Sequence, residues 1–241
     1  MSSFELIDRV RTGDRVALAR LVSLIESGEP GVAEAIGALS GGGQAARRIG
    51  ITGPPGAGKS TLINAIIAEL RSRSMSVAVL AVDPSSPLTG GALLGDRIRM
   101  QDHVEDEGVY VRSMASRGHL GGLAVAAAAT IDILSKAAFD YVLVETVGVG
   151  QSEVEVMDLV DLVVLVVGPG WGDQIQAEKA GVVEIADLFV INKADRPGVD
   201  EVRRALLGAA GELGPEVLIT TATTGAGVGA LVDAIDRLLA T

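Results

Sequence analysis

The sequence predicts an α/β fold, in which a mostly parallel β-sheet is covered by helices on both faces and preceded by a short N-terminal helical annex. Short segments that are apolar at every position, such as Leu162–Val167, alternate along the chain with longer helical patterns. Strands apolar on both faces are typical of parallel sheets buried between helices. Glycine-rich polar segments follow several of these strands, where α/β sheets bind their ligands.

The first 45 residues form the predicted annex. Apolar residues recur at roughly helical spacing from Leu6 to Leu24. Gly13 and Asp14 are typical of a helix break followed by a new N-cap, and the glycines that follow Ser40 are typical of a linker. We therefore expect a helical annex over residues 1–45 and an α/β domain over residues 46–241.

The α/β domain is predicted from regularly alternating segments. The predicted strands are residues 49–52, 76–82, 109–112, 141–145, 162–167, 188–192 and 217–220. The predicted helices include residues 59–71, 120–136 and 228–239, and the segment between residues 83 and 103 is polar and glycine-rich. We find no internal repeat in the sequence, so these segments are expected to build one sheet.

Composition excludes several classes of protein. The chain has 241 residues with no cysteine, 31 glycines, 48% hydrophobic residues and a net charge of -11. The hydrophobic content is enough to build a core, and the missing cysteines exclude disulfide scaffolds and thiol catalysis. The acidic balance and scarce aromatic residues argue against nucleic-acid binding. No apolar run has the length of a signal peptide or membrane span, so we expect a cytoplasmic protein that contacts no membrane.

A phosphate-binding motif follows the first predicted strand and opens a helix. The segment matches the pattern G-x-x-x-x-G-K-[ST], whose glycines let backbone N–H groups turn toward phosphates while the lysine adds a positive charge. The helix N-terminus contributes further N–H groups, and the motif's serine hydroxyl is a ligand for Mg²⁺. This pattern predicts a P-loop NTPase. The predicted nucleotide-contacting residues here are Gly53, Pro54, Pro55, Gly56, Ala57, Gly58, Lys59, Ser60 and Thr61.

A second motif indicates which base is bound. Asn192, Lys193 and Asp195 form an N-K-x-D pattern after an apolar strand, which resembles the guanine-reading motif of P-loop GTPases. An aspartate can accept hydrogen bonds from guanine N1–H and the 2-amino group, and adenine offers neither donor. After the last predicted strand, the segment Thr221, Ala222 and Thr223 stands where GTPases present a backbone contact to the guanine oxygen.

Acidic residues near the predicted phosphate site are candidate Mg²⁺ ligands. Glu145 and Gly148 match the D-x-x-G segment of GTPases with Glu replacing Asp, so the acid is expected to hold Mg²⁺ and the glycine amide to sense the γ-phosphate. Asp83 and Asp96 lie on the glycine-rich segment and suit direct or water-mediated Mg²⁺ binding, unless Asp83 forms a turn and Asp96 caps a helix. We expect catalysis to rest on Lys59, Asp96 and Glu145. The sequence assigns no residue to orient the attacking water.

Five longer segments occur in order along the chain: GITGPPGAGKSTL, AVDPSSPLTGGALLGDRIRM, LVETVGVGQSE, GDQIQAEKAG and INKADRPG. Together they resemble the MeaB/ArgK-type GTPases, which are chaperones of methylmalonyl-CoA mutase and related acyl-CoA mutases. The match runs from about Leu6 to Leu239, and the second and third segments are the most specific to this group.

The resemblance implies a GTPase that binds GTP, GDP and Mg²⁺ and has a cobalamin-dependent acyl-CoA mutase as its partner. In this family, GTP binding and hydrolysis gate the loading of adenosylcobalamin and protect the mutase from inactivation. The resemblance also places a third switch at Asp173, Gln176 and Lys179, unless these residues simply begin an amphipathic helix. Family members usually continue into C-terminal dimerisation helices, whereas this sequence ends at Thr241, so we expect either a homodimer formed across the nucleotide or binding to a mutase-associated partner.

Three other functions fit parts of the sequence. A nickel-insertion metallochaperone GTPase shares the broader fold, but such proteins usually carry cysteine or histidine clusters, and this chain has no cysteine and two isolated histidines, His103 and His119. A P-loop kinase would need an acceptor site, and none is evident. A nucleotide-dependent binding protein without useful hydrolysis is the third alternative, because no residue is assigned to orient the attacking water.

Overall fold

The computed structural model describes residues 3–29, 31–32, 37, 45–84, 103, 105–116, 120–146, 155–172, 183–211 and 214–240. Over these residues the hydrogen-bonded strand order is β3-β2-β4-β1-β5-β6-β7, which makes a seven-stranded sheet. Strand β1 pairs in parallel with β5, β2 with β3, β5 with β6 and β6 with β7. The predicted α/β class with a mostly parallel sheet is therefore confirmed.

The elements keep close to the predicted segments. The strands are β1 (Arg47–Thr52), β2 (Val77–Pro84), β3 (Val109–Ser116), β4 (Tyr141–Thr146), β5 (Leu162–Val167), β6 (Leu188–Ile191) and β7 (Glu216–Ile219). The helices are α1 (Ser3–Arg11), α2 (Arg15–Glu26), α4 (Lys59–Ser72), α6 (Leu120–Lys136), α9 (Val199–Ala210) and α10 (Val228–Leu239).

Strands β2 and β3 extend furthest past their predicted ends. The expected ends at residues 82 and 112 are replaced by Pro84 in β2 and Ser116 in β3. The reason is the register, which pairs every residue of the two strands in parallel up to Pro84 and Ser116. Backbone pairing thus carries both strands past the apolar residues on which the prediction depended.

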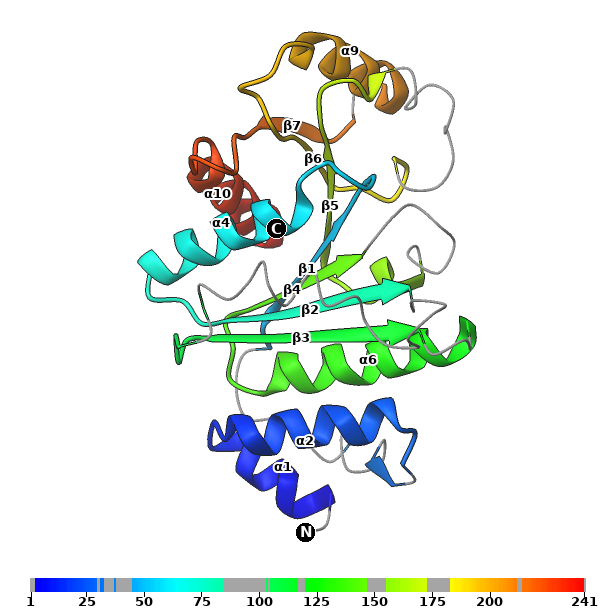
Figure 1. Ribbon diagram of the computed structural model, residues 1–241, viewed down its shortest axis with the longest axis vertical. Helices are drawn as coiled ribbons and strands as arrows, with labels where there is room; N and C mark the ends of the chain where they lie inside the picture. Colours follow the sequence, from blue (N-terminus) through cyan, green and yellow to red (C-terminus); the bar gives the residue numbers. More distant parts are fainter. Residues whose placement is uncertain are drawn as a thin grey trace. The chain divides into compact units, whose positions relative to one another are not determined.

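The chain divides into two compact units, one of residues 1–48 and 75–142 and the other of residues 49–74 and 143–241. In the first unit, α1 packs on α2, α2 on α6, and α6 on β3 and β2, as the lower part of Figure 1 shows. The Asp14 side chain accepts a hydrogen bond from the Ala17 N–H at 2.9 Å and caps α2. The predicted break at Gly13 and Asp14 is therefore confirmed.

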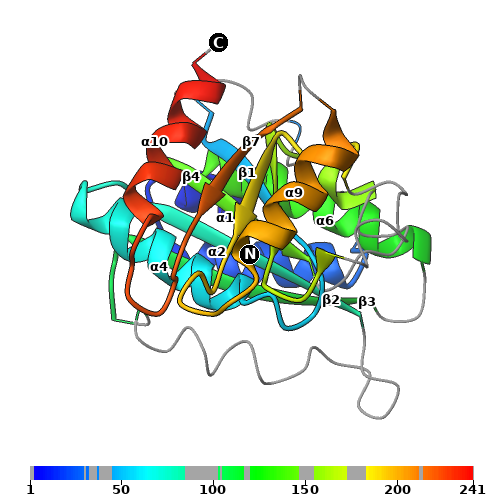
Figure 2. The same ribbon diagram turned by 90° about the horizontal axis from the view of Figure 1, so that it is seen from above.

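Two strands of the second unit, β5 and β6, are buried along their whole length. Helix α10 packs on α4 and β5, whereas α9 packs on β6, and Figure 2 shows α9 and α10 on opposite sides of β7. Burial against these helices accounts for the continuous apolar sequences of β5 and β6. Among the residues described, no helix is long and apolar enough to cross a membrane.

Candidate nucleotide-binding site

The P-loop connects the end of β1 to the start of α4, and its glycines are required by its geometry. A Cβ on Gly53 would lie 2.0 Å from the Val166 carbonyl oxygen, and one on Gly58 would lie 2.6 Å from Asn192 Nδ2. Gly53, Gly56 and Gly58 all have positive φ, which L side chains rarely adopt. The loop therefore passes close to β5 and to the N-K-x-D segment in a conformation that glycine permits.

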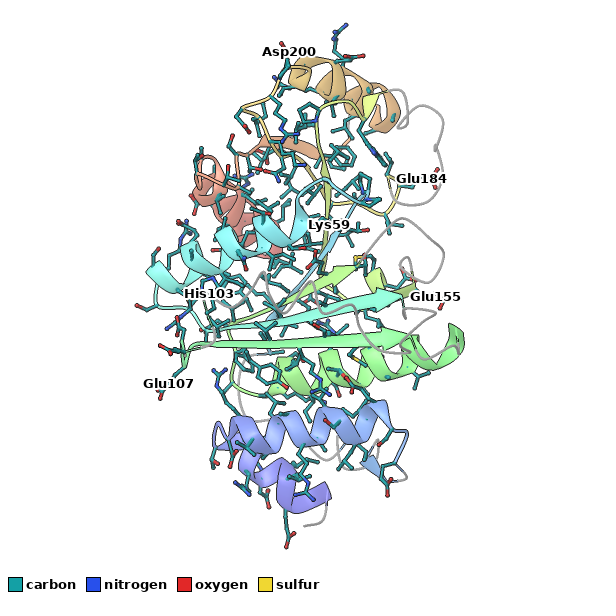
Figure 3. All side chains as sticks on the ribbon, viewed as in Figure 1. Lys59, His103, Glu107, Glu155, Glu184 and Asp200 are labelled. Atoms are coloured by element: carbon teal, nitrogen blue, oxygen red, sulfur yellow. The ribbon has the colours of Figure 1, made fainter. Side chains whose placement is uncertain are left out.

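Lys59 is the first residue of α4, and its ammonium group turns back over the P-loop. Its Nζ donates to the carbonyl oxygens of Gly53 at 2.7 Å and Pro54 at 3.1 Å, although only 6% of the residue is exposed. Figure 3 shows Lys59 at the beginning of the helix. Because the amides of a first helical turn lack intrahelical partners, the positive charge and the N–H groups are available at the same end of α4.

Ser60 and Glu145 form a buried pair beside Lys59. The Ser60 hydroxyl donates to Glu145 Oε1 at 2.8 Å, and the two residues are 7% and 2% exposed. Glu145 belongs to β4, all six residues of which are buried. The structure thus brings together an acid and a hydroxyl that are far apart in sequence. Both supply the hard oxygen atoms that Mg²⁺ prefers.

Asn192 connects the P-loop to the segment after β7. Its Nδ2 donates to the Ala57 carbonyl oxygen at 3.1 Å, and its Oδ1 accepts from the Ala222 N–H at 3.1 Å and from the Thr220 hydroxyl at 3.2 Å. Only 1% of Asn192 is exposed. Three segments that the sequence suggested separately therefore form one hydrogen-bonded structure.

Lys193 and Asp195 occupy the turn that follows Asn192. Lys193 has a φ of 60°, which is uncommon outside glycine, and its Nζ donates to the Gly56 carbonyl oxygen at 2.5 Å. Its stem therefore reaches across to the P-loop, while Asp195 is exposed. The arrangement leaves the Asp195 carboxylate accessible beside a lysine that is held against the phosphate loop.

The segment after β7 is a closed turn. Thr221 N–H donates to the Ala226 carbonyl at 2.9 Å, and a Cβ on Gly227 would lie 2.2 Å from the Ile219 carbonyl oxygen. Ala222 is buried and Thr223 is exposed. Thr220 was predicted only as a strand end. A polar residue at the last position of an apolar strand, next to a base-reading turn, was the signal that could have identified it.

Several predicted residues fall outside the described part of the chain. These are Asp96, Gly148, Asp173, Gln176 and Lys179, and for Asp83 only the backbone, at the end of β2, is described. Within the described ranges, no group of three or more histidine, cysteine or acidic side chains could hold a metal ion. Of the predicted Mg²⁺ ligands, Ser60 and Glu145 are therefore the two whose side chains the structure brings together.

The sequence profile of the family described as methylmalonyl Co-A mutase-associated GTPase MeaB matches residues 18–241. A Pyrococcus abyssi protein named as a GTPase is 51% identical over 240 residues, which cover 96% of this chain and 74% of that protein. The chain belongs to the MeaB family of GTPases. Membership in the MeaB family confirms the resemblance drawn from the sequence and supports binding of guanine nucleotides and GTP hydrolysis.

Two further relatives of this MeaB-family chain support the family assignment and the fold. GTPase ArgK of Escherichia coli K12 is 44% identical over 198 residues, covering 79% of this chain and 59% of ArgK. The crystal structure titled LAO/AO transport system kinase superposes with a TM-score of 0.78 at 32% identity, covering 97% of this chain and 74% of that one. The structural match confirms the predicted fold class.

Proposed function

We propose that this protein is a cytoplasmic, GTP-dependent chaperone of a cobalamin-dependent acyl-CoA mutase of the methylmalonyl-CoA mutase type. In this proposal, GTP binding and hydrolysis gate the loading of adenosylcobalamin onto the mutase and protect it from inactivation. The observation that carries the proposal is the match of residues 18–241 to the mutase-associated family. The hydrogen-bonded assembly of P-loop, N-K-x-D segment and β7 turn supports the nucleotide-binding part.

The nucleotide would lie along the residues that this assembly joins. The amides from Gly53 to Thr61 would surround the phosphates, with Gly148 as the proposed γ-phosphate sensor. Asn192, Lys193 and Asp195 would hold the guanine base, with the segment from Thr221 to Thr223 at its oxygen edge. Support comes from the 3.1 Å bonds that tie Asn192 to Ala57 and Ala222, because they fix the base loop relative to the phosphate loop.

The residues present fit a Mg²⁺ ion. Ser60 and Glu145 offer a hydroxyl and a carboxylate oxygen 2.8 Å apart next to Lys59, which is the oxygen chemistry this ion takes. We propose that Ser60 and Glu145 hold Mg²⁺ together with Asp83 and Asp96. When bound, the ion would neutralise charge that develops on the phosphate oxygens.

Hydrolysis is proposed to rest mainly on electrostatics. Lys59 would move from the carbonyls of Gly53 and Pro54 to the β- and γ-phosphate oxygens, where its charge opposes theirs. Glu145 would keep the Ser60 hydroxyl oriented through their 2.8 Å bond, and Asp96 would add a second acid. With no residue assigned to orient water, slow intrinsic turnover is the expected behaviour.

The role of Glu145 predicts a change in Mg²⁺ dependence. In Glu145→Gln, the side chain keeps its shape and can still accept from Ser60, but its negative charge is gone. We expect the Mg²⁺ concentration for half-maximal GTP hydrolysis to rise about tenfold or more, since removing a group that holds or supports a bound metal typically costs about 10–100-fold in metal affinity. Phosphate release measured across a Mg²⁺ titration tests this. An unchanged half-maximal concentration would exclude Glu145 from the metal site.

The partner is tested by capture of purified methylmalonyl-CoA mutase. The immobilised protein is offered the mutase with GDP, with GTP and with a non-hydrolysable GTP analogue. We expect binding that differs between nucleotide states, and Lys59→Ala as a matched variant should lose that difference. No capture of the mutase in any nucleotide state would refute the chaperone role.

The protein is also proposed to form a homodimer across the bound nucleotide. Measuring the mass of the free protein in solution with the same nucleotides tests this homodimer.

A further inference from the structure

Arg73 ties the end of α4 to the beginning of α10 within the second unit. On α4, its Nε and Nη2 donate to Glu69 Oε1 at 2.9 and 2.7 Å. On α10, its Nη1 donates to Asp233 Oδ1 at 2.6 Å, and its Nη2 donates to the Gly229 carbonyl oxygen at 3.3 Å. The two helices pack against each other and lie side by side in Figure 1. Hydrogen bonds to Asp233 and Glu69 also raise the pKa of Arg73, so its guanidinium stays charged.

The end of α10 that Arg73 contacts has no side-chain cap. The N-cap residue is Gly227, and no side chain accepts a hydrogen bond from the first amides of the helix. The first amides of a helix lack intrahelical partners, and helix ends are where fraying begins. Arg73 binds Gly229 in this first turn and Asp233 one turn later. It therefore stabilises the end of α10 that its own sequence leaves uncapped.

The same end of α10 continues directly from the turn that is proposed to read the base. We call the segment Thr221–Gly227 the base-reading turn. Val228 N–H donates to the Gly225 carbonyl at 3.2 Å, and Leu231 N–H donates to the Gly227 carbonyl at 3.1 Å. These two bonds join the turn to the first turn of the helix. A movement of the beginning of α10 would therefore move the base-reading turn with it.

We propose that Arg73 is a positioning residue for the bound guanine nucleotide, which slows nucleotide release by holding the first turn of α10 against α4. This inference rests on the proposed nucleotide site and adds to it a residue that lies on neither the P-loop nor the base-reading turn. Helix α4 begins at Lys59 beside the P-loop and ends at Ser72, next to Arg73. Arg73 thus joins the helix that follows the phosphate loop to the helix that follows the base-reading turn.

The rate of nucleotide release tests this role. Arg73→Met keeps an unbranched side chain and removes the hydrogen bonds to Glu69, Asp233 and Gly229. We expect a fluorescent GDP analogue to dissociate about fivefold faster, which is the size of effect that partly exposed ion pairs have. The side chains of Arg73 and Asp233 are 31% and 65% exposed, so the difference from wild type should shrink as salt is raised. A chase with unlabelled GDP at several salt concentrations measures both effects.

Two further measurements separate positioning from a general loss of structure. Arg73 lies at the opposite end of α4 from Lys59, so Arg73→Met should hydrolyse bound GTP at the wild-type single-turnover rate. Asp233→Asn weakens the same contact from the α10 side and should speed release about threefold. Arg73→Met should then have a smaller effect in the Asp233→Asn background than in wild type, because the two side chains act through one contact. Fully independent factors, or an unchanged release rate in Arg73→Met, would overturn the proposal.

Arg237 offers a matched control on the same helix. It lies near the other end of α10, where it pairs with Glu216 at 2.5 Å. Arg237→Met removes an ion pair of α10 without changing its first turn, so the release rate should stay at the wild-type value. Equal acceleration by the two arginine variants would mean that α10 is loosened as a whole, which contradicts a specific role for Arg73.

Two outcomes keep this test separate from folding and from the nucleotide site itself. If Arg73→Met does not fold, Asp233→Asn carries the test alone, and an unchanged release rate in that variant contradicts the proposal. Failure of the wild-type chain to bind the GDP analogue would refute the nucleotide site itself. Tight binding with a release rate that does not depend on Arg73 would refute only the positioning role.

Discussion

Replacing Lys59 with alanine is expected to lower GTP turnover by about 10²–10³-fold, the usual cost of removing one preorganised donor at a developing negative charge. The affinity for GTP should fall by about 100-fold, because a buried charge-assisted contact to phosphate is lost. The side chain is 6% exposed and lies on the P-loop carbonyls, so its charge is placed where phosphates are proposed to bind. Single-turnover hydrolysis and titration of a fluorescent GTP analogue measure the two effects.

A second lysine-to-alanine variant controls for loss of charge and of packing. Lys136 ends α6 and pairs with Asp132 at 2.8 Å, outside the P-loop segment and the N-K-x-D segment. Lys136→Ala should hydrolyse GTP at the wild-type rate. Thermal unfolding of Lys59→Ala without nucleotide checks that the P-loop tolerates the change. If Lys59→Ala stays folded and keeps the wild-type turnover, Lys59 has no role in phosphate chemistry.

The phosphate site was predictable because its chemistry is local in sequence. The strand, the glycine loop and the helix that begins at Lys59 are contiguous, and each has its own pattern, so the motif predicted the loop between β1 and α4 that the structure contains. The helices at residues 120–136 and 228–239 were predicted with the bounds they have. In these cases the local sequence pattern that identifies an element also contains the residues that determine where the element begins and ends.

Contacts between distant segments were not predictable in the same way. The Asn192 amide and the Ala57 carbonyl oxygen lie 3.1 Å apart because the order of the parallel strands brings them together. The number of residues between them in the sequence does not predict this contact. Thr220 was missed for the same reason, since its importance depends on a bond to a residue of the neighbouring strand's end. The extended ends of β2 and β3 likewise follow from pairing between strands.

Asp195→Asn is expected to reverse the choice of base from guanine to xanthine. A carboxylate beside guanine can accept from both N1–H and the 2-amino group, whereas the asparagine carboxamide keeps one acceptor and turns a donor toward the amino group. In xanthine that amino group is replaced by a carbonyl oxygen, which accepts from the asparagine N–H. Because hydrogen bonds to a charged group contribute about 1.5–3 kcal/mol each, the affinity for GDP should fall about 100-fold or more.

The Asp195→Asn variant tests base recognition separately from folding, because the hydrogen bonds that hold the turn do not involve the Asp195 carboxylate. Asp195 is exposed, and the backbone around it is held by the bond from Ala194 N–H to the Thr220 carbonyl and by Lys193 on Gly56, none of which uses the carboxylate. The variant should therefore fold normally, and competition between GDP and XDP measures the base preference alone. Asp200, exposed in the first turn of α9 and labelled in Figure 3, supplies the matched variant Asp200→Asn, which should still prefer GDP. If Asp195→Asn also prefers GDP over XDP, the base is read by another group, since loss of the carboxylate's charge must otherwise appear in this ratio.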